Sequence, residues 1–211
     1  MRALTAHTDD LFAPAMHRLV HDDQGGIRYW PGAIDPDTAQ AWFEALHAQA
    51  AWIHLQRPMY DRIVDVPRLL ANYAVDALPP ELPLAGLLAC VQARAPAPYS
   101  RIGMNLYRDG HDSVAMHGDK LHTVAAGHPI TLVSLGAPRR MLIRAREGRR
   151  ETLAVDLAPG SILSMSHASQ STHEHGIPKT RRSQGPRISV VFRVRPSSPV
   201  GTGGLAGVGA T

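Results

Sequence analysis

The feature that most constrains the fold is a succession of short apolar segments that fills the second half of the chain. From residue 101 to residue 195 they read RIGMNLY, SVAMH, ITLVSLG, RRMLIRA, ETLAVDL, SILSM and RISVVFRVR, and turns rich in Gly, Pro and Asp separate them. Seven short strands at this spacing are typical of a jelly roll or barrel. With 211 residues, 44% of them apolar, the chain is long enough for one well-buried core. We therefore expect a single, mainly β domain.

Two helical patterns precede these strands. The first begins after Asp35, whose side chain can cap the first amides, with Pro36 at the first helical position, and it runs to about Gln49. Apolar residues recur every three or four positions in both patterns, and the second stops before Pro96. They are Ala39, Trp42, Phe43 and Leu46 in the first pattern, and Leu84, Leu87, Leu88 and Val91 in the second. These stripes predict two helices that brace one face of the strands, which makes the fold class α+β, mainly β.

Composition shifts divide the chain into three parts. Residues 1–26 have no clear periodicity and are expected to be irregular, and a single domain follows over residues 27–195, beginning with a short edge strand near 27–30. Residues 196–211 are rich in Gly, Pro and Ser and predict a flexible tail. Between the two helices, residues 57–74 fit either a loop-rich cover over the domain or plain strand and turn.

Charge and cysteine content narrow the class of protein. A net charge of +4 and a pI of about 9.6 are compatible with an anionic substrate or a polyanion but require neither. The single cysteine, Cys90, excludes an internal disulfide and a cysteine-rich zinc site. The N-terminus lacks an apolar core of signal-peptide length, and no run approaches the ~20 apolar residues of a membrane span. We expect a cytoplasmic monomer that does not associate with a membrane.

The segment NLYRDGHDSVAMHGD, residues 105–119, ends in a His-x-Asp pair. On an extended strand, residues two apart point the same way with Cα atoms only ~6.5–7 Å apart, so His117 and Asp119 can hold one ion. Gly118 between them adds no bulk, which suits close packing. Two histidines and one carboxylate with open coordination positions are the ligand set of non-haem Fe(II) oxygenases, which raises the question of the second histidine.

Three histidines are candidates for the distant ligand. His167, His173 and His175 all follow the predicted strand SILSM, where the chain could return to face His117. Of these, His175 opens the segment His-Gly-Ile-Pro, in which Gly176 permits a tight backbone. The residues by themselves leave all three open.

The segment RISVVFRVR, residues 187–195, alternates with a period of two. Arg187 and Arg193 therefore share one face with Cα atoms ~20 Å apart, while the other face is apolar enough to lie in the core. A guanidinium binds a carboxylate through paired hydrogen bonds, so two arginines leaning inward could hold a small dicarboxylate. A solvated strand face is the competing interpretation. Asn105 and Tyr107 repeat the spacing one strand earlier and offer neutral hydrogen bonds.

Taken together, these residues resemble the AlkB family of Fe(II)- and 2-oxoglutarate-dependent dioxygenases, which reverse alkylation damage on nucleic-acid bases. The similarity covers about residues 57–195. It rests on the order and spacing of NLYRDG, HGD, VSLGAPR, APGSILSM, EHGIPKT and PRISVVFR. The resemblance implies a double-stranded β-helix, in agreement with the strand count, and implies Fe(II), 2-oxoglutarate and dioxygen as cofactor and cosubstrates.

The resemblance also implies roles for individual residues. The iron ligands would be His117, Asp119 and His175. The residues that bind 2-oxoglutarate would be Asn105, Tyr107, Arg187, Ser189 and Arg193. Of these five, Arg193 and Asn105 would hold the carboxylate nearest the iron, and the other three would hold the distal carboxylate. Because the chemistry is centred on iron, no separate acid or base residue is implied.

The segment VPRLLANY is similar to the family's nucleotide-recognition lid, which would span residues 57–74 and place Tyr60 and Tyr73 near the substrate. Arg139 is a candidate contact to the phosphates of a nucleic acid. Several family members carry an acidic residue two positions beyond the ligand aspartate, where this chain has Leu121. That departure bears on which bases are accepted.

The implied reaction is oxidative dealkylation of N-alkylated bases in single-stranded or flipped-base DNA, with RNA as a further substrate. It would release formaldehyde, succinate and carbon dioxide. Two other classes of protein stay open. One is a 2-oxoglutarate oxygenase that acts on a protein or a small molecule, and the other is a non-catalytic β-barrel module whose metal is structural.

Overall fold

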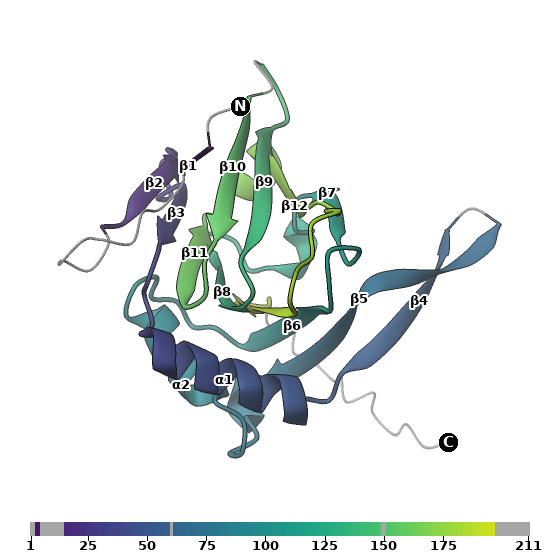
Figure 1. The fold of residues 1–211 in the computed structure, drawn as a ribbon. Helices are drawn as coiled ribbons and strands as arrows, with labels where there is room; N and C mark the ends of the chain where they lie inside the picture. The colour runs from purple at the N-terminus through teal and green to yellow at the C-terminus, as the bar shows by residue number, and fades with distance from the viewer. Residues whose placement is uncertain (1–2, 5–14, 60, 149–150, 197–211) are drawn as a thin grey trace, which may run out of the picture.

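The computed structural model describes residues 3–4, 15–59, 61–148 and 151–196, and within them the chain forms two sheets and three α-helices (Figure 1). The larger sheet has the strand order β2 (His17–Val20), β3 (Ile27–Trp30), β11 (Ser161–Met165), β8 (Ile130–Gly136), β13 (Arg187–Arg193), β6 (Arg101–Tyr107), β5 (Arg62–Ala74) and β4 (Ile53–Met59). The smaller sheet has the order β1 (Ala3–Leu4), β10 (Thr152–Leu157), β9 (Arg139–Ala145), β12 (His173–Ile177) and β7 (Val114–His117). Neighbouring strands are antiparallel except β1 and β10. This mainly β, α+β architecture agrees with the predicted class and is consistent with a jelly roll.

The helices are α1 (Pro36–Gln49), α2 (Leu84–Gln92) and the short α3 (Ser169–Thr172), with 3-10 turns η1 (Val75–Ala77) and η2 (Leu121–Thr123). Asp35 caps α1 as predicted, because its Oδ1 accepts a hydrogen bond from the Thr38 amide at 2.9 Å. Figure 1 shows α1 and α2 together on one side of the larger sheet. Their buried residues join one core with the outer face of that sheet, which includes Leu46, Leu87 and Phe192. The predicted bracing by two helices is confirmed.

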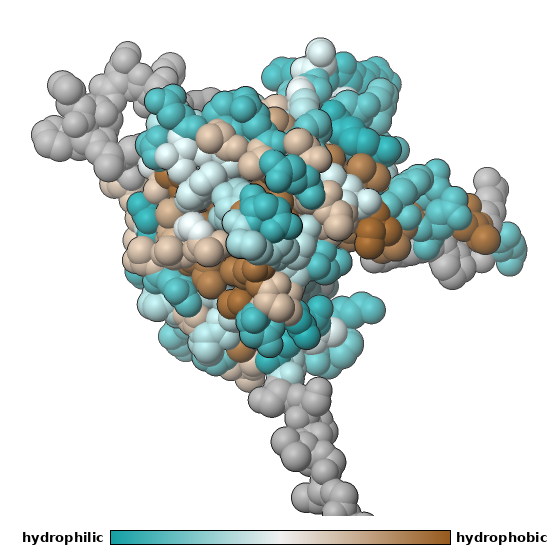
Figure 2. All heavy atoms as spheres, turned by 90° about the horizontal axis from the view of Figure 1, so that it is seen from below, coloured by the Kyte–Doolittle hydropathy of each residue, from teal (hydrophilic) through white to brown (hydrophobic). Residues whose placement is uncertain are grey.

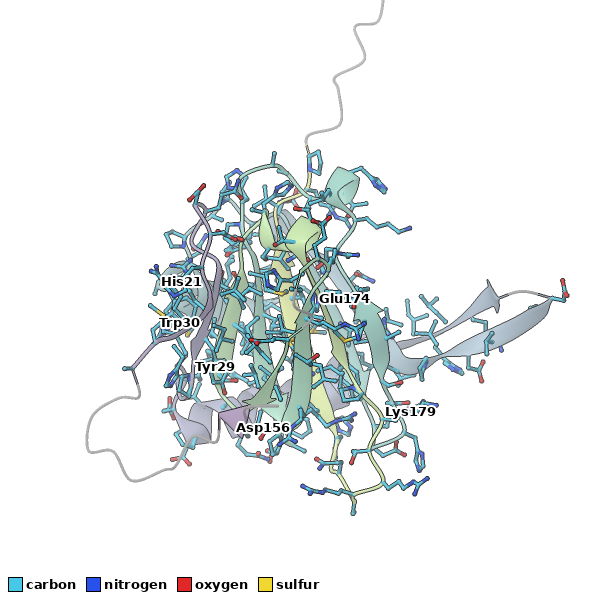
Figure 3. All side chains as sticks on the ribbon, turned by 90° about the horizontal axis from the view of Figure 1, so that it is seen from above. His21, Tyr29, Trp30, Asp156, Glu174 and Lys179 are labelled. Atoms are coloured by element: carbon cyan, nitrogen blue, oxygen red, sulfur yellow. The ribbon has the colours of Figure 1, made fainter. Side chains whose placement is uncertain are left out.

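A second apolar core lies between the two sheets. It includes Leu132 and Val191 of the larger sheet and Met141, Ile143 and Leu157 of the smaller one. At the β3 side, the Tyr29 hydroxyl donates to the Asp156 carbonyl at 3.1 Å and so ties the sheets together, as the neighbouring positions of the two residues in Figure 3 show. The polar side chains of β13, which are Arg187, Ser189 and Arg193, therefore point into the space between the two sheets.

Residues 57–74 form most of a long hairpin that projects from the body of the molecule (Figure 1). Strand and turn was thus the correct interpretation of this segment, and the loop-rich cover was wrong. Figure 2 shows apolar atoms along this arm. Ile63 and Val64 are 73% and 42% exposed, and Ile53 and Leu55 near the start of β4 are exposed as well.

The prediction of an irregular segment over residues 1–26 is correct for residues 15–16 and 21–26, but residues 3–4 form β1 and residues 17–20 form β2. The strand expected near 27–30 is present as β3, but it is not an edge strand, since β2 covers its outer side. The tail predicted from residue 196 lies, apart from that residue, outside the described residues. In the described ranges no helix combines the length and apolarity needed to cross a membrane.

Candidate active site

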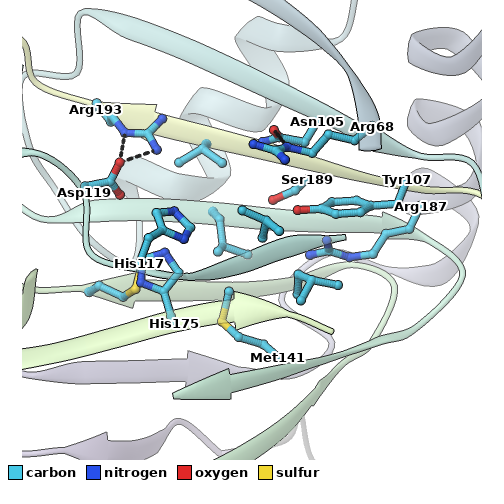
Figure 4. Close-up of a pocket in the computed structure, with 15 residues that line it drawn as sticks. Arg68, Asn105, Tyr107, His117, Asp119, Met141, His175, Arg187, Ser189 and Arg193 are labelled. Carbon is cyan, nitrogen blue, oxygen red and sulfur yellow. Dashed lines mark hydrogen bonds and ion pairs between the residues drawn. The ribbon is translucent and has the colours of Figure 1, made fainter. Parts of the chain in front are cut away.

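A cavity of about 110 Å³ opens between the two sheets, and Figure 4 shows the side chains that line it. Its floor is apolar and includes Leu132, Met141, Met165, Ile177 and Val191. Its polar lining residues are Arg68, Asn105, Tyr107, His117, Asp119, His175, Arg187, Ser189 and Arg193. The structure thus brings all three predicted iron ligands and all five predicted 2-oxoglutarate residues into one pocket.

His117 and His175 come from neighbouring strands of the smaller sheet. Their Cα atoms are direct partners in the β7–β12 ladder, and their ring centroids lie 4.6 Å apart. Nδ1 of His117 lies 2.8 Å from the Ala115 carbonyl, and because a carbonyl can only accept, Nδ1 donates this hydrogen bond and Nε2 is the nitrogen left to face a metal. Burial, together with the nearby His117, lowers the pKa of His175 to about 4. The His175 ring is therefore neutral at neutral pH, which is the form that binds metals.

The other two candidate histidines do not line this pocket. His173 precedes His175 by two residues on β12, and its Nδ1 lies 2.9 Å from the Thr172 hydroxyl. Burial lowers the pKa of His173 as well. Neither His173 nor His167 is among the residues that line the cavity.

Asp119 is held by Arg193. Its Oδ1 accepts hydrogen bonds from Nη2 of Arg193 at 2.8 Å and from Nε at 3.2 Å, whereas its Oδ2 is buried without a hydrogen-bond partner. As the side chains lie, no three His, Cys, Asp or Glu residues in the described ranges are arranged to hold a metal ion.

The donor types nevertheless fit Fe(II). Two imidazoles and a carboxylate oxygen that lacks a partner form the two-histidine, one-carboxylate set of non-haem iron enzymes. His117, His175 and Asp119 would therefore hold the metal. Cys90 lies on α2 and is not among the residues that line this pocket.

Arg187 is a buried cation at one end of the pocket. Its side chain is 1% exposed, its Nε donates to the Ser134 hydroxyl at 2.9 Å, and both terminal nitrogens are buried without a partner. Burial lowers its pKa to about 10, which still leaves it charged at neutral pH. An unpaired buried charge is costly, so an anionic group bound at this end of the pocket would stabilise Arg187. The competing interpretation of a solvated strand face is wrong.

Tyr107 and Ser189 lie at the same end of the pocket as Arg187 (Figure 4). The guanidinium carbon of Arg187 lies 5.3 Å from the centre of the Tyr107 ring, and both Tyr107 and Ser189 are at most 5% exposed. Burial raises the pKa of Tyr107, so its hydroxyl keeps its proton. These two hydroxyls can therefore donate hydrogen bonds beside the guanidinium.

Close backbone contacts explain the two glycines beside the proposed ligands. A Cβ on Gly118 would lie 2.5 Å from the Gln170 carbonyl oxygen, and one on Gly176 would lie 2.9 Å from the Val114 carbonyl oxygen. Gln170, which the sequence analysis missed, also accepts a hydrogen bond from the Asp119 amide through its buried side chain at 3.0 Å. The pairing of β12 with β7 shifts register after His175, and a residue without a side chain lets the two backbones meet.

Three predicted substrate residues need a different account. Arg139 is only 3% exposed, and it donates to the carbonyls of Asp109, Asp112 and Pro178, so it cannot reach a phosphate. Tyr73 points to the opposite face of the larger sheet, where it packs on the helix-side core and accepts a hydrogen bond from the Ala51 amide. Tyr60 lies outside the described residues.

A much wider cleft of about 910 Å³ adjoins the pocket. One side of it is lined by strand β5, through residues 64–68, Leu70 and Asn72. Further cations at its lining are Lys120, Lys179 and Arg195. Leu121, the position at which the sequence departs from the family it resembles, is 40% exposed in η2.

Comparison with known proteins places this geometry in context. The family model described as "2OG-Fe(II) oxygenase superfamily" matches residues 87–193. The chain is 33% identical over 97 residues to the DNA oxidative demethylase ALKBH2 of Bos taurus, a match that covers 43% of this chain but only 35% of that protein. It is 26% identical over 191 residues to the alpha-ketoglutarate-dependent dioxygenase alkB homolog 3 of Mus musculus, covering 82% of this chain and 67% of that protein.

Two solved structures share the fold. An oxidoreductase of the 2OG-Fe(II) oxygenase family from Burkholderia pseudomallei superposes with a TM-score of 0.55 at 17% identity, covering 80% of this chain and 85% of that one. The structure of OsALKBH1 superposes with a TM-score of 0.56 at 15% identity, covering 81% and 97%. At such identities the likeness concerns the fold alone.

Proposed function

This chain belongs to the 2OG-Fe(II) oxygenase superfamily, and on that premise we propose that it catalyses the oxidative dealkylation of N-alkylated bases in DNA or RNA. The family implies Fe(II) and 2-oxoglutarate, and we propose dioxygen as the second cosubstrate. The AlkB resemblance of the sequence is confirmed, since its relatives are alkB homologues. The products would be formaldehyde, succinate and carbon dioxide.

One observation carries the proposal. A facing pair of histidines and a buried arginine with two unpartnered terminal nitrogens line the same enclosed pocket. His117, His175 and Asp119 supply the donors that Fe(II) prefers, and Arg187 supplies the donors that a carboxylate prefers. A metal and a dicarboxylate bound side by side would satisfy both groups. A structural metal alone would leave Arg187 unexplained.

Bound together, iron, 2-oxoglutarate and dioxygen would supply the oxidation of an N-alkyl group at the expense of the keto acid. Arg187, Tyr107 and Ser189 would bind the distal carboxylate of 2-oxoglutarate through charge-assisted hydrogen bonds. Arg193 would hold the proximal carboxylate while it keeps Asp119 oriented. The apolar floor formed by residues such as Leu132 and Val191 would exclude bulk water from the reacting groups.

The wide cleft is the proposed place for the nucleic acid. Lys120, Lys179 and Arg195 line it and suit phosphates, whereas the narrow pocket is too small for a duplex. A base inside a duplex would have to be flipped out, so single-stranded substrates would be accepted most readily. The β4–β5 hairpin forms one wall of the cleft, and we propose it as the nucleotide-recognition lid. Tyr73 and Arg139 are no longer proposed as substrate contacts.

The test is succinate formation by the purified protein with Fe(II) and 2-oxoglutarate. A single-stranded oligonucleotide that carries 1-methyladenine should stimulate succinate and formaldehyde release, and the unmethylated oligonucleotide should not. His175→Ala serves as the inactive control. If neither methylated DNA nor methylated RNA increases succinate formation, the proposed repair function is refuted. Succinate formation with another substrate would still support the oxygenase activity. Stimulated turnover should also fall as salt rises, because phosphate contacts release counterions.

A further inference from the structure

Arg68 lies at the boundary between the narrow pocket and the wide cleft, and it lines both. It comes from the hairpin strand β5, whereas its partners come from elsewhere. Its Nε donates to Oδ1 of Asn105 on β6 at 2.8 Å, and its Nη1 donates to the Ser113 carbonyl, just before β7, at 3.2 Å. Figure 4 shows Arg68 beside Asn105 at the pocket wall. One side chain thus connects the hairpin with β6, which carries Asn105 and Tyr107, and with the residue just before β7, which carries His117.

The Arg68 contact decides which end of the Asn105 amide faces the pocket. A guanidinium has five N–H donors and no acceptor, so the amide must present its oxygen to Arg68. The Nδ2 group is then left free of Arg68 as a donor on a residue that lines the pocket. Without this donor the amide could turn over and present oxygen to a bound carboxylate, which would repel it. The neighbours of Asn105 across the sheet are Leu70 and Ser189. Leu70 is apolar and makes no hydrogen bond, and the Ser189 hydroxyl can either donate or accept, so neither residue would fix the orientation of the Asn105 amide as Arg68 does.

We propose that Arg68 is a positioning residue for the cosubstrate: it orients Asn105 so that Nδ2 donates to a carboxylate of 2-oxoglutarate. The inference rests on the proposed use of 2-oxoglutarate in this pocket, but it is independent of what the substrate is. Arg68 therefore acts through Asn105 and does not itself bind the cosubstrate. Because it belongs to the hairpin strand, it also couples cosubstrate affinity to the position of the cleft wall.

The experiment measures the Kd of 2-oxoglutarate by isothermal titration into the full chain loaded with Mn(II), which is free of turnover. Arg68→Met should weaken binding about tenfold, the effect of losing one hydrogen bond to a charged group. Asn105→Ala should weaken it at least as much, and the double variant should be no weaker than Asn105→Ala alone. Arg18→Met, which removes an exposed arginine from β2, should leave the Kd unchanged.

Three results would overturn the proposal: an unchanged Kd in Arg68→Met, losses that multiply in the double variant, or a loss of oligonucleotide affinity without loss of 2-oxoglutarate affinity. Asn105→Asp tests the same claim if Arg68→Met does not fold. The aspartate keeps Arg68 paired but replaces the Nδ2 donor with an oxygen, so it should weaken 2-oxoglutarate more than tenfold. Unchanged affinity in that variant would also refute the role. If the unaltered protein binds no 2-oxoglutarate, the proposed function itself fails, whereas inactivity on methylated DNA would leave this inference intact.

Discussion

His117 and His175 face each other across the β7–β12 ladder, with ring centroids 4.6 Å apart. They reach this position from segments that are distant in the chain, because β12 returns alongside β7 with a shift of register just after His175. Gly118 and Gly176 allow the close approach of backbones that this arrangement needs. The candidate metal site therefore depends on strand pairing as much as on its ligands.

The first prediction separates the two neighbouring histidines of β12. His175→Ala removes a side chain that would bind the metal directly. Loss of a residue that only hydrogen-bonds to a metal ligand costs about 10–100-fold in affinity, so His175→Ala should weaken Mn(II) or Fe(II) binding by more than that. His173→Ala should largely preserve affinity, since His173 does not line the pocket. Titration of the metal into both variants checks this. Equal losses, or a larger loss in His173→Ala, would contradict the assignment.

The second prediction concerns the backbone contact beneath the His-x-Asp pair. Gly118→Ala should lower the free energy of unfolding by about 1–3 kcal/mol, because the new Cβ would lie 2.5 Å from the Gln170 carbonyl oxygen. Metal affinity should fall too, since relief of this contact displaces Asp119. The matched control is Gly185→Ala, whose Cβ would meet nothing nearer than Ala137 at 3.4 Å. Urea unfolding of both variants measures the difference, and equal stability would count against the contact.

The third prediction uses the unpaired charge of Arg187. Arg187→Met should leave the stability of the ligand-free protein within about 1 kcal/mol of the original or raise it, because a buried charge without a partner is replaced by an apolar side chain. At 100 times its Kd, 2-oxoglutarate should stabilise the Mn(II)-loaded original protein by about 2.7 kcal/mol. The same concentration should not stabilise Arg187→Met. Thermal unfolding with and without 2-oxoglutarate tests both halves.

The control for this experiment is Arg140→Met, which removes an exposed arginine that pairs with Asp156 on the outside of the smaller sheet. That variant should keep the stabilisation by 2-oxoglutarate. If Arg187→Met is still stabilised by the ligand to the full extent, the distal carboxylate does not bind at this end of the pocket.

The fourth prediction is a pH dependence of stability at the turn before β7. Burial alone would raise the pKa of Asp112, but the hydrogen bonds from the Arg108 side chain and amide outweigh it and lower that pKa below its usual value. Since the folded-state pKa lies below the unfolded value near ~3.9, the ionised carboxylate stabilises the fold fully above that pH and loses this contribution as the pH falls through the folded pKa.

Asp112→Asn, which cannot ionise, should therefore be about 1–2 kcal/mol less stable than the original protein at pH 7. The difference should shrink as the pH falls from about 5 to about 2. Urea unfolding at a series of pH values measures it, with Asp156→Asn as a comparison at an exposed arginine pair. A difference that stays constant over this range would mean that the charge of Asp112 contributes nothing.

Local patterns determined much of this protein. Strands β6, β8 and β9 begin and end at the predicted residues, and α1 starts at its predicted cap, because alternation, turn residues and capping act between close neighbours in the chain. The same alternation placed Arg187 and Arg193 on one face of β13. The motif spacing and the resemblance together selected His117, Asp119 and His175, which the structure brings into one pocket.

Only the tertiary structure decided which partners those side chains meet. The sequence suggested Arg139 as a phosphate contact, but in the structure its side chain donates to three backbone carbonyls. It also suggested that Tyr73 lies near the substrate, but Tyr73 lies on the face of the sheet that packs on the helices. Gln170 gave no signal in the sequence, and Arg68 stood out only as part of the VPRLLANY segment. Their contacts are with Asp119 and Asn105, which are far away in the chain. Periodicity sets the face on which a residue lies, whereas burial and strand pairing over long sequence distances set what that face contacts.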